Sequence, residues 1–195
     1  METADVLLSQ LQTSGILLQH DTMLLSLTTI VAGAPVSGSW WAHPQAPQMY
    51  ALINILAAHP DVLVAKLVRG KATFIHRSLW PALLAVACAG EAWQVARLSD
   101  AARALYEAVE RQGVLRATGM VPKELERRLL VQSMQVHTEA GRHELQLMQW
   151  ILWAQQVSCA PALTAAAGRF QLGAAVQAIG GTQGMLPWKT KTLPE

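Results

Sequence analysis

The segment SDAARALYEAVERQGVLRATGMVPKELERRLLVQSMQVHTEAGRHELQLM, residues 99–148, decides the fold of this chain. Ser99 can cap a helix with a helically spaced apolar face, and Gly113 ends that helix. Pro122 starts a second helix, and Gly141 allows two following strands to reverse direction. The expected elements are a helix over 99–112, an extended piece over 114–118, a helix over 123–130, and strands over 131–138 and 142–148.

The order of these elements is that of a winged helix whose middle helix is shortened or replaced by the turn at 117–121. A winged helix places one short helix in the major groove of DNA, and its hairpin touches the flanking backbone. The sequence therefore predicts a winged-helix-like unit over 99–157.

The predicted short helix and hairpin carry side chains of the types that contact phosphates and base edges. The candidate nucleic-acid-binding residues are Lys123, Arg127, Arg128, Gln132, Gln135, His137, Arg142 and His143. The alternative is an ordinary solvated surface, in which Glu124 and Glu126 balance the cations.

A second hairpin is predicted nearer the N-terminus, from strands over 62–68 and 72–76 that flank Arg69-Gly70-Lys71. It supplies a rival basic surface, made of Lys66, Arg69, Lys71 and Arg77. Such a ribbon can follow a phosphate backbone. The alternative is that lysines on edge strands only prevent strand-to-strand aggregation.

The predicted fold class is α+β, mostly helical with two β-hairpins. A helical N-terminal unit spans 1–98 with its hairpin at about 62–76, and an Ala- and Gly-rich segment spans 158–195. Trp40 and Trp41 could stack bases or line a pocket, but burial in the core is the favoured interpretation. The segment 180–184 is predicted to be a flexible loop.

Charged residues are scarce: they make up 14% of 195 residues, against 52% apolar residues, and the net charge is +2. This composition excludes a disordered or polybasic chain. No run of about 20 apolar residues occurs, so we expect a cytoplasmic protein without a membrane span and with Cys88 and Cys159 reduced and buried. The charge is concentrated over 61–144, which hold 12 Lys or Arg and 9 Asp or Glu.

No motif for a phosphate-binding loop, a dinucleotide site, a nucleophile elbow or a zinc protease occurs. His137, Glu139 and His143 lie around one predicted turn and could ligate a metal, but the further ligand of a zinc site is not evident. We therefore predict neither a metal nor a cofactor.

Two stretches carry a resemblance to a known family. The segments ELERRLL (124–130) and VHTEAGRH (136–143) resemble a bacterial family of winged-helix-like proteins of largely uncharacterised function. DVLVAKLVRGKATFIHRSLWP (61–81) is similar to the N-terminal half of that family, so the resemblance spans about residues 38–155. It implies a winged-helix-like fold.

A remoter similarity is to the winged-helix DNA glycosylases of the AlkZ/YcaQ type, which remove alkylated or crosslinked bases and rely on a Gln-x-Gln or Gln-x-Asp pair. Gln10-Leu-Gln12 has that spelling. This similarity assigns no catalytic residue to the chain.

The combined prediction is a protein that binds double-stranded DNA without catalysis and forms a homo-oligomer, a dimer through its charge-poor N-terminal surface. Two alternatives stay open at this point. One is a DNA-repair enzyme of the glycosylase kind, and the other is a structural or protein-interaction module without nucleic acid.

Overall fold

The computed structural model describes residues 2–137, 143–160 and 162–189, and the chain divides into two compact units. Unit 1 contains the residues up to Trp80 and those from Phe170 onward, and unit 2 contains Pro81–Arg169. Each unit holds a three-stranded antiparallel sheet. The predicted α+β class, mostly helical with two β-hairpins, is confirmed.

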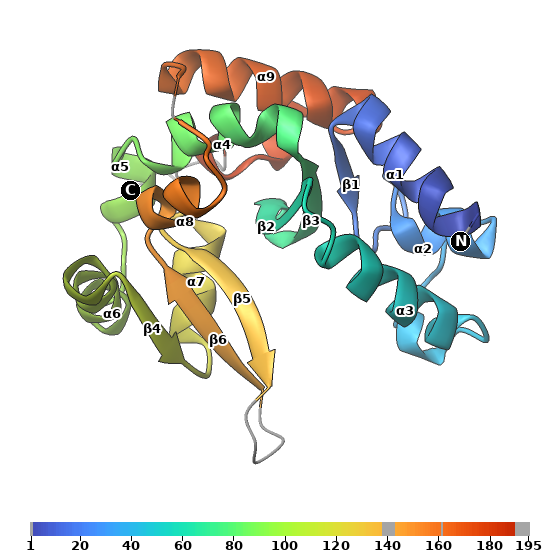
Figure 1. Ribbon diagram of the computed structural model, residues 1–195, viewed down its shortest axis with the longest axis horizontal. Coiled ribbons are helices and arrows are strands. Elements are labelled where there is room, and N and C mark those ends of the chain that lie inside the picture. Colours follow the sequence, from blue (N-terminus) through green and yellow to red (C-terminus); the bar gives the residue numbers. More distant parts are fainter. Residues whose placement is uncertain (1, 138–142, 161, 190–195) are drawn as a thin grey trace. The chain divides into compact units, whose positions relative to one another are not determined.

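Unit 1 forms its sheet in the order β1-β3-β2, with α1, α2 and α3 gathered beside it (Figure 1). Its buried side chains include Leu7, Leu27, Met49 and Phe74, which come from three helices and the central strand. Its elements are α1 (Glu2–Ser14), β1 (Ile16–Leu18), α2 (Leu27–Ala32), the 3₁₀ turn η1 (Trp40–Ala42), α3 (Ala46–Ala57), β2 (Val62–Val68), β3 (Lys71–His76), η2 (Arg77–Leu79), η3 (Gln183–Met185) and η4 (Pro187–Lys189).

Unit 2 forms its sheet in the corresponding order, β4-β6-β5 (Figure 1). Helix α6 packs on α7, and Val109, Leu125 and Leu147 meet in the core between helices and sheet. Its elements are α4 (Trp80–Ala87), which begins at the unit boundary, α5 (Ala92–Val95), α6 (Asp100–Gln112), β4 (Val114–Ala117), α7 (Val121–Arg127), β5 (Gln132–His137), β6 (His143–Met148), α8 (Trp150–Gln156) and α9 (Ala165–Ala178), which continues into unit 1.

The predicted hairpin around Gly70 is confirmed, and its turn has the backbone expected of a two-residue loop. Val68 pairs with Lys71, while Arg69 and Gly70 have φ of 50° and 67°. Positive φ at both central residues is the signature of a type I′ turn, whose twist matches that of the flanking strands. Arg69 lacks the freedom of glycine, so tertiary contacts must hold it in this conformation.

The caps of α6 are also confirmed. Ser99 accepts a hydrogen bond from the Ala102 N–H, and Gly113 follows the helix with φ of 78°. The prediction for 114–118 corresponds to β4, and the prediction for 123–130 corresponds to α7, which begins and ends earlier.

Three elements differ from the sequence expectations. Helix α1 ends at Ser14, and the next residues form β1, a buried edge strand that pairs with β3 and that the sequence did not predict. The Ala- and Gly-rich tail contains the 14-residue helix α9. Residues 91–98, for which the sequence predicted no separate element, contain α5, whose capping box joins Glu91 and Gln94.

No helix in the described parts of the chain is long and apolar enough to cross a membrane. Neither Cys88 nor Cys159 is in a disulfide, but the expected burial of Cys88 is wrong, because this residue is exposed at the end of α4, and Cys159 is only half-buried. Burial of part of the Cys88 side chain and the negative charge of Glu110 raise the pKa of its thiol, which keeps it protonated and weakly nucleophilic.

Helix α9 approaches α4 closely because residue 168 has no side chain. A Cβ at Gly168 would lie 2.5 Å from the Ala82 carbonyl oxygen and 3.1 Å from Val86 Cγ2. Gly173, further along α9, differs: a Cβ there would lie 3.3 Å from Nε2 of Gln183, the end of a flexible side chain.

Substitution Gly168→Ala is expected to lower the free energy of unfolding by about 1–3 kcal/mol, because backbone must shift to admit the methyl group. The matched variant Gly173→Ala should be neutral or stabilising by up to about 1 kcal/mol, since alanine favours the helix. Urea denaturation of both variants measures the difference. Equal stability of the two variants would contradict the close contact at residue 168.

Candidate nucleic-acid interface

Helix α7 is short and firmly anchored in unit 2. Pro122 occupies its first turn, and the side chain of Leu125 is fully buried. The helix ends where Leu129 adopts a positive φ of 51°, and the Leu130 N–H bonds the Leu125 carbonyl at 3.1 Å. The indole N–H of Trp150 donates to the Leu129 carbonyl at 2.9 Å and fixes this turn.

The two acidic residues of α7 are bound to neighbouring serines. Glu124 accepts hydrogen bonds from the N–H and the hydroxyl of Ser99, at 3.1 and 2.8 Å. Glu126 is buried and accepts from the Ser133 hydroxyl at 2.5 Å. Burial raises the pKa of Glu124, but the Ser99 hydrogen bonds and the charge of Arg128 outweigh it, and the pKa lies below its ordinary value.

Arg128 has a structural role. Its guanidinium donates to the carbonyls of Trp93, Gln94 and Arg97 at 2.9, 3.3 and 2.8 Å, and it lies 3.8 Å from the Glu124 carboxylate. These carbonyls belong to α5 and the residues that follow it, where a helix end leaves acceptors without intrahelical partners. A phosphate could engage Arg128 only by breaking these bonds.

Lys123 and Arg127 are different from Arg128, since both are exposed on the outer side of α7. They lie at positions i and i+4, so their side chains share one face of the helix. Neither side chain makes a hydrogen bond or an ion pair within the described portion of the chain. The prediction of a basic face on this helix thus rests on two cations.

The hairpin beyond α7 adds polar side chains of mixed environment. Gln132 is half-buried, and its side-chain amide donates to the Ser133 carbonyl at 3.0 Å. Gln135 is exposed, but it also makes a polar or electrostatic contact with another part of the protein. His137 and His143 pair opposite each other in the β5–β6 ladder. Arg142 and Glu139 lie outside the described residues, as do the side chains of both histidines, so the predicted roles at the tip stay predictions.

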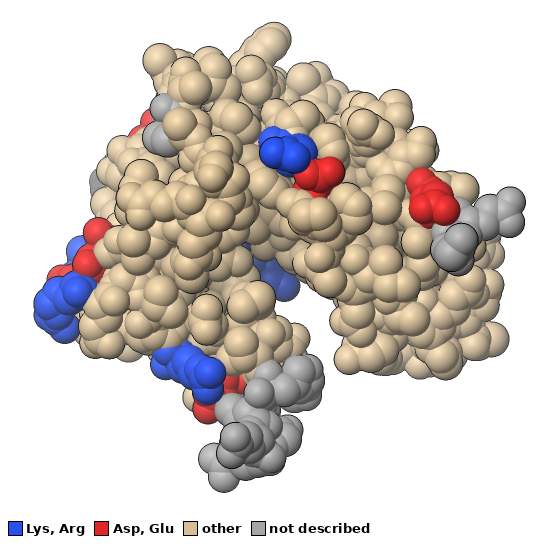
Figure 2. All heavy atoms as spheres, in the orientation of Figure 1, with Lys and Arg blue, Asp and Glu red and all other residues tan. Residues whose placement is uncertain are grey.

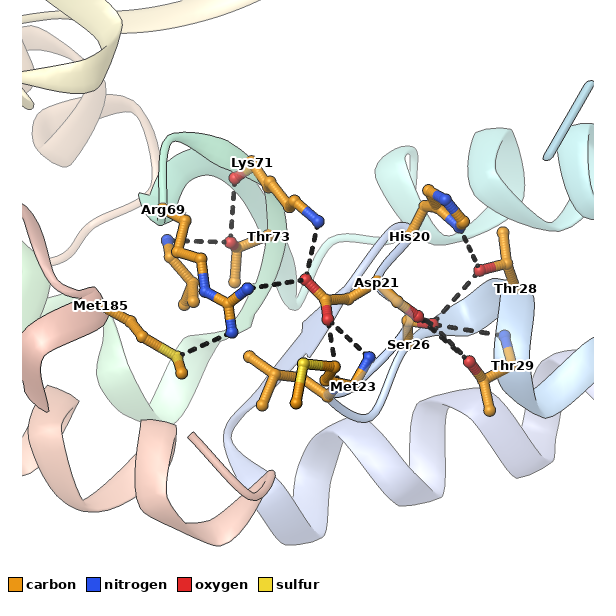
Figure 3. A network of polar contacts seen from close by, with 12 residues as sticks. His20, Asp21, Met23, Ser26, Thr28, Thr29, Arg69, Lys71, Thr73 and Met185 are labelled. Atoms are coloured by element: carbon orange, nitrogen blue, oxygen red, sulfur yellow. Dashed lines mark hydrogen bonds and ion pairs between the residues drawn. The ribbon is translucent and has the colours of Figure 1, made fainter. Parts of the chain in front are cut away.

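Two cations of the rival hairpin in unit 1, Arg69 and Lys71, lie against one buried carboxylate, that of Asp21. The Asp21 carboxylate is 1% exposed and lies 2.7 Å from Lys71 Nζ and 4.0 Å from Arg69 Nη1 (Figure 3). It also accepts the N–H groups of Met23 and Leu24 at 2.8 and 3.0 Å. This carboxylate is therefore neutralised and solvated by the protein itself.

The tip of the same hairpin is tied to the C-terminal segment of unit 1. The Arg69 N–H donates to the Met185 carbonyl at 2.8 Å, and Nη2 of Arg69 lies 3.3 Å from Met185 Sδ (Figure 3). These contacts supply the tertiary support that the positive φ of Arg69 requires. Arg77 pairs with Asp61 at 2.8 Å, and Lys66 lies within an irregularity of the β2–β3 register.

Charge is nearly balanced within each unit. Unit 2 has nine Lys or Arg against eight Asp or Glu, and the residues of unit 1 include six against five. Figure 2 shows charged side chains that are few and scattered on the face drawn. The small net charge of each unit contrasts with the strongly basic composition typical of domains that bind nucleic acid tightly.

Other predicted sites do not come together. Gln10 and Gln12 are two positions apart on α1, so their side chains point in different directions and cannot bind one substrate group as a pair. A shallow depression beside them is lined by Asp5, Val6, Ser9, Gln10 and Thr13, all from this one helix. Among the described residues, no group of three His, Cys, Asp or Glu side chains could hold a metal ion.

Trp40 and Trp41 have opposite environments. Trp40 is buried in the unit 1 core as expected, but Trp41 is 61% exposed, so burial of both rings is wrong. The pattern of adjacent aromatic residues could not distinguish them, because successive residues of the η1 turn point to different sides.

Comparison with known proteins gives no match: no protein-family model, no curated protein and no solved structure is significantly similar to the chain. The resemblance to winged-helix-like proteins therefore stays a prediction.

Arg128 and Arg127 are adjacent, and the structure assigns them different roles that stability measurements can separate. Arg128→Ala is expected to lower the free energy of unfolding by about 1–3 kcal/mol, because it leaves carbonyls near α5 without donors. Arg127→Ala should change it by less than about 0.5 kcal/mol. Chemical denaturation of both variants tests this, and equal effects would refute the structural role of Arg128.

Asp21 gives unit 1 a specific sensitivity to acid. Burial raises its pKa, but the hydrogen bond from Lys71 and those from the Met23 and Leu24 N–H groups more than offset it, so the pKa is about 2. A carboxyl whose pKa is lowered by folding stabilises the folded state above its unfolded pKa. That contribution is lost as the pH falls toward the folded pKa.

Asp21→Asn is therefore expected to destabilise the protein at neutral pH. The difference from wild type should shrink by about 2 kcal/mol as the pH falls from about 4 to about 2. Denaturation across this range measures the difference, with Asp61→Asn as the control because its ion pair with Arg77 is solvent-exposed. A difference that is independent of pH would contradict the prediction.

Proposed function

We propose that this chain is a non-catalytic, winged-helix-like protein that binds double-stranded DNA through α7 of unit 2. The observation that carries the proposal is the pair Lys123 and Arg127, exposed on one face of α7 while both acids of that helix are held by serines. Like charges at i and i+4 destabilise a helix, and a phosphate group that lies between them relieves that repulsion.

The order of elements supports the winged-helix interpretation. Unit 1 runs helix, strand, helix, helix, strand, strand, and its first strand pairs with its last. From α6 onward, unit 2 has the same strand pairing but one helix fewer, because α7 alone lies between β4 and β5. The helix directly before the hairpin is α3 in unit 1 and α7 in unit 2, and this is the position of the helix that a winged helix places in the major groove.

The two helices at this position differ in charge. Helix α3, APQMYALINILA, contains no ionisable group except the Tyr50 phenol, whereas α7, VPKELER, carries exposed cations. The hairpin of unit 1, moreover, directs Arg69 and Lys71 to Asp21. We therefore assign the contact with DNA to unit 2.

Two cations set the scale of the interaction. Each phosphate that a cation neutralises contributes about 0.9 to the slope of log K against log salt, so Lys123 and Arg127 together contribute about 2. Such an interface binds weakly and without strong sequence preference at physiological salt.

The test is the fluorescence anisotropy of a labelled DNA duplex, titrated with protein at several salt concentrations. Lys123→Glu/Arg127→Glu is expected to weaken binding about tenfold or more at low salt and to reduce the salt slope by about 2. The matched control is Arg103→Glu/Arg111→Glu, which changes the net charge equally on the exposed side of α6 and should leave the slope unchanged.

Equal losses in the two double variants would show that only net charge matters and would overturn the assignment to α7. If the wild-type protein does not bind the duplex at low salt, the proposed function fails. In that case the chain is a protein-interaction module without nucleic acid, and the exposed apolar side chains of unit 1 favour this alternative.

A further inference from the structure

We infer that the outer face of α3 in unit 1 is a dimer interface that binds the same face of a second copy of this chain. This surface, the apolar α3 face, consists of six exposed residues: Trp41, Pro47, Tyr50, Ala51, Asn54 and Ile55. The inference is independent of DNA binding by unit 2.

The burial of α3 separates its two sides clearly. Met49, Leu52 and Leu56 are buried on the side toward the unit 1 core. On the opposite side Tyr50 is 44% exposed and Ile55 51% exposed. The outward side of a monomeric surface helix is polar or charged, so this helix has apolar side chains where water would favour ionic ones.

The aromatic side chains of this face are held in place before any partner binds. The Trp41 ring stacks on that of buried Trp40, with centroids 4.0 Å apart and planes at 26°. The Tyr50 ring lies 5.4 Å from the Trp41 ring. Side chains that are already ordered lose little conformational entropy on association, and large aromatic rings supply most of the energy at an interface.

Charge identifies the occupant. Residues 22–60 contain no Asp, Glu, Lys or Arg. Of the flanking acids, Asp21 is buried against Lys71 and Asp61 pairs with Arg77. A charged partner would lose hydration on this face and gain no ion pair in return, so the partner surface must also be uncharged and apolar. A second copy provides such a surface, and a two-fold axis places the same patch against itself.

Area sets the strength of the dimer. If a whole side chain of this size has about 150–250 Å², the exposed fractions of Trp41, Tyr50 and Ile55 leave roughly 350 Å² in contact with water. Pairing two such faces buries roughly 700 Å² from these side chains, which is below the roughly 1,000 Å² that a stable specific interface exceeds and fits a weak association. We therefore expect a concentration-dependent dimer rather than an obligate one.

The experiment is sedimentation velocity of the full chain over a wide range of protein concentrations, on three proteins. The wild type should change from monomer to dimer as the concentration rises. Tyr50→Lys places a charge in the apolar α3 face and should raise the dissociation constant at least tenfold. Phe170→Lys is the matched control, because Phe170 is 75% exposed on α9, outside this face, and its loss should leave the dimer intact.

At a concentration where all three proteins are monomeric, their circular dichroism and their midpoints of urea unfolding must be the same, since all substitutions are at exposed positions. A wild type that stays monomeric over the whole range overturns the inference. So does a Tyr50→Lys protein that dimerises as well as the wild type, or a Phe170→Lys protein that loses the dimer instead.

A second measurement tests the geometry. In a background of Cys88→Ser/Cys159→Ser, Ala51→Cys places a thiol in the middle of the apolar α3 face. A two-fold interface brings this thiol near its own copy, so oxidation should yield a disulfide-linked dimer faster than in the control Phe170→Cys. Equal rates for the two thiols would place the contact elsewhere and overturn the inference.

Discussion

The burial of the Asp21 carboxylate is the constraint on which unit 1 depends. An ionised carboxylate inside a protein needs hydrogen-bond donors and an opposite charge, and the chain supplies both from two places. The turn after β1 gives the Met23 and Leu24 N–H groups, and the β2–β3 hairpin gives Lys71 and Arg69. The turn that follows β1 and the β2–β3 hairpin are thereby fixed to each other.

The same constraint decides what the hairpin can do. Its turn carries Arg69 in a conformation that glycine prefers, and contacts with Asp21 and Met185 hold it there. A basic hairpin that looks suited to phosphate in sequence is therefore an internal ionic bridge. In a chain with 14% charged residues, the partner of each cation matters more than the count of cations.

Local signals predicted the parts of the fold that depend on local chemistry. The type I′ turn at Gly70 and the capped helix between Ser99 and Gly113 could be read from the sequence, because turns and caps need particular residues. Strand β1 could not, because three buried residues show no alternation. Helix α9 could not either, since its close packing at Gly168 depends on α4 and its own sequence has no clear apolar stripe.

The candidate site shows the same division. Lys123 and Arg127 were predictable as cations on a short helix, but Arg128 has the same chemistry and differs only through carbonyls that α5 brings to it. Likewise the sequence suggests Glu124 and Glu126 as partners of the cations, but Ser99 and Ser133 donate to these carboxylates, and the cation beside Glu124 is the structural Arg128. Such distinctions depend on contacts between residues far apart in sequence.

The placement of the charge-free helix α3 and the cationic helix α7 in different units has a thermodynamic consequence. In the proposed DNA complex, dissolved ions would compete with α7 for phosphate, whereas excluded salts such as sulfate would strengthen the proposed association of apolar α3 faces. The two proposed associations would therefore respond to ionic conditions with opposite sign. A single solution variable would then favour the proposed dimer over the proposed DNA complex, or the reverse.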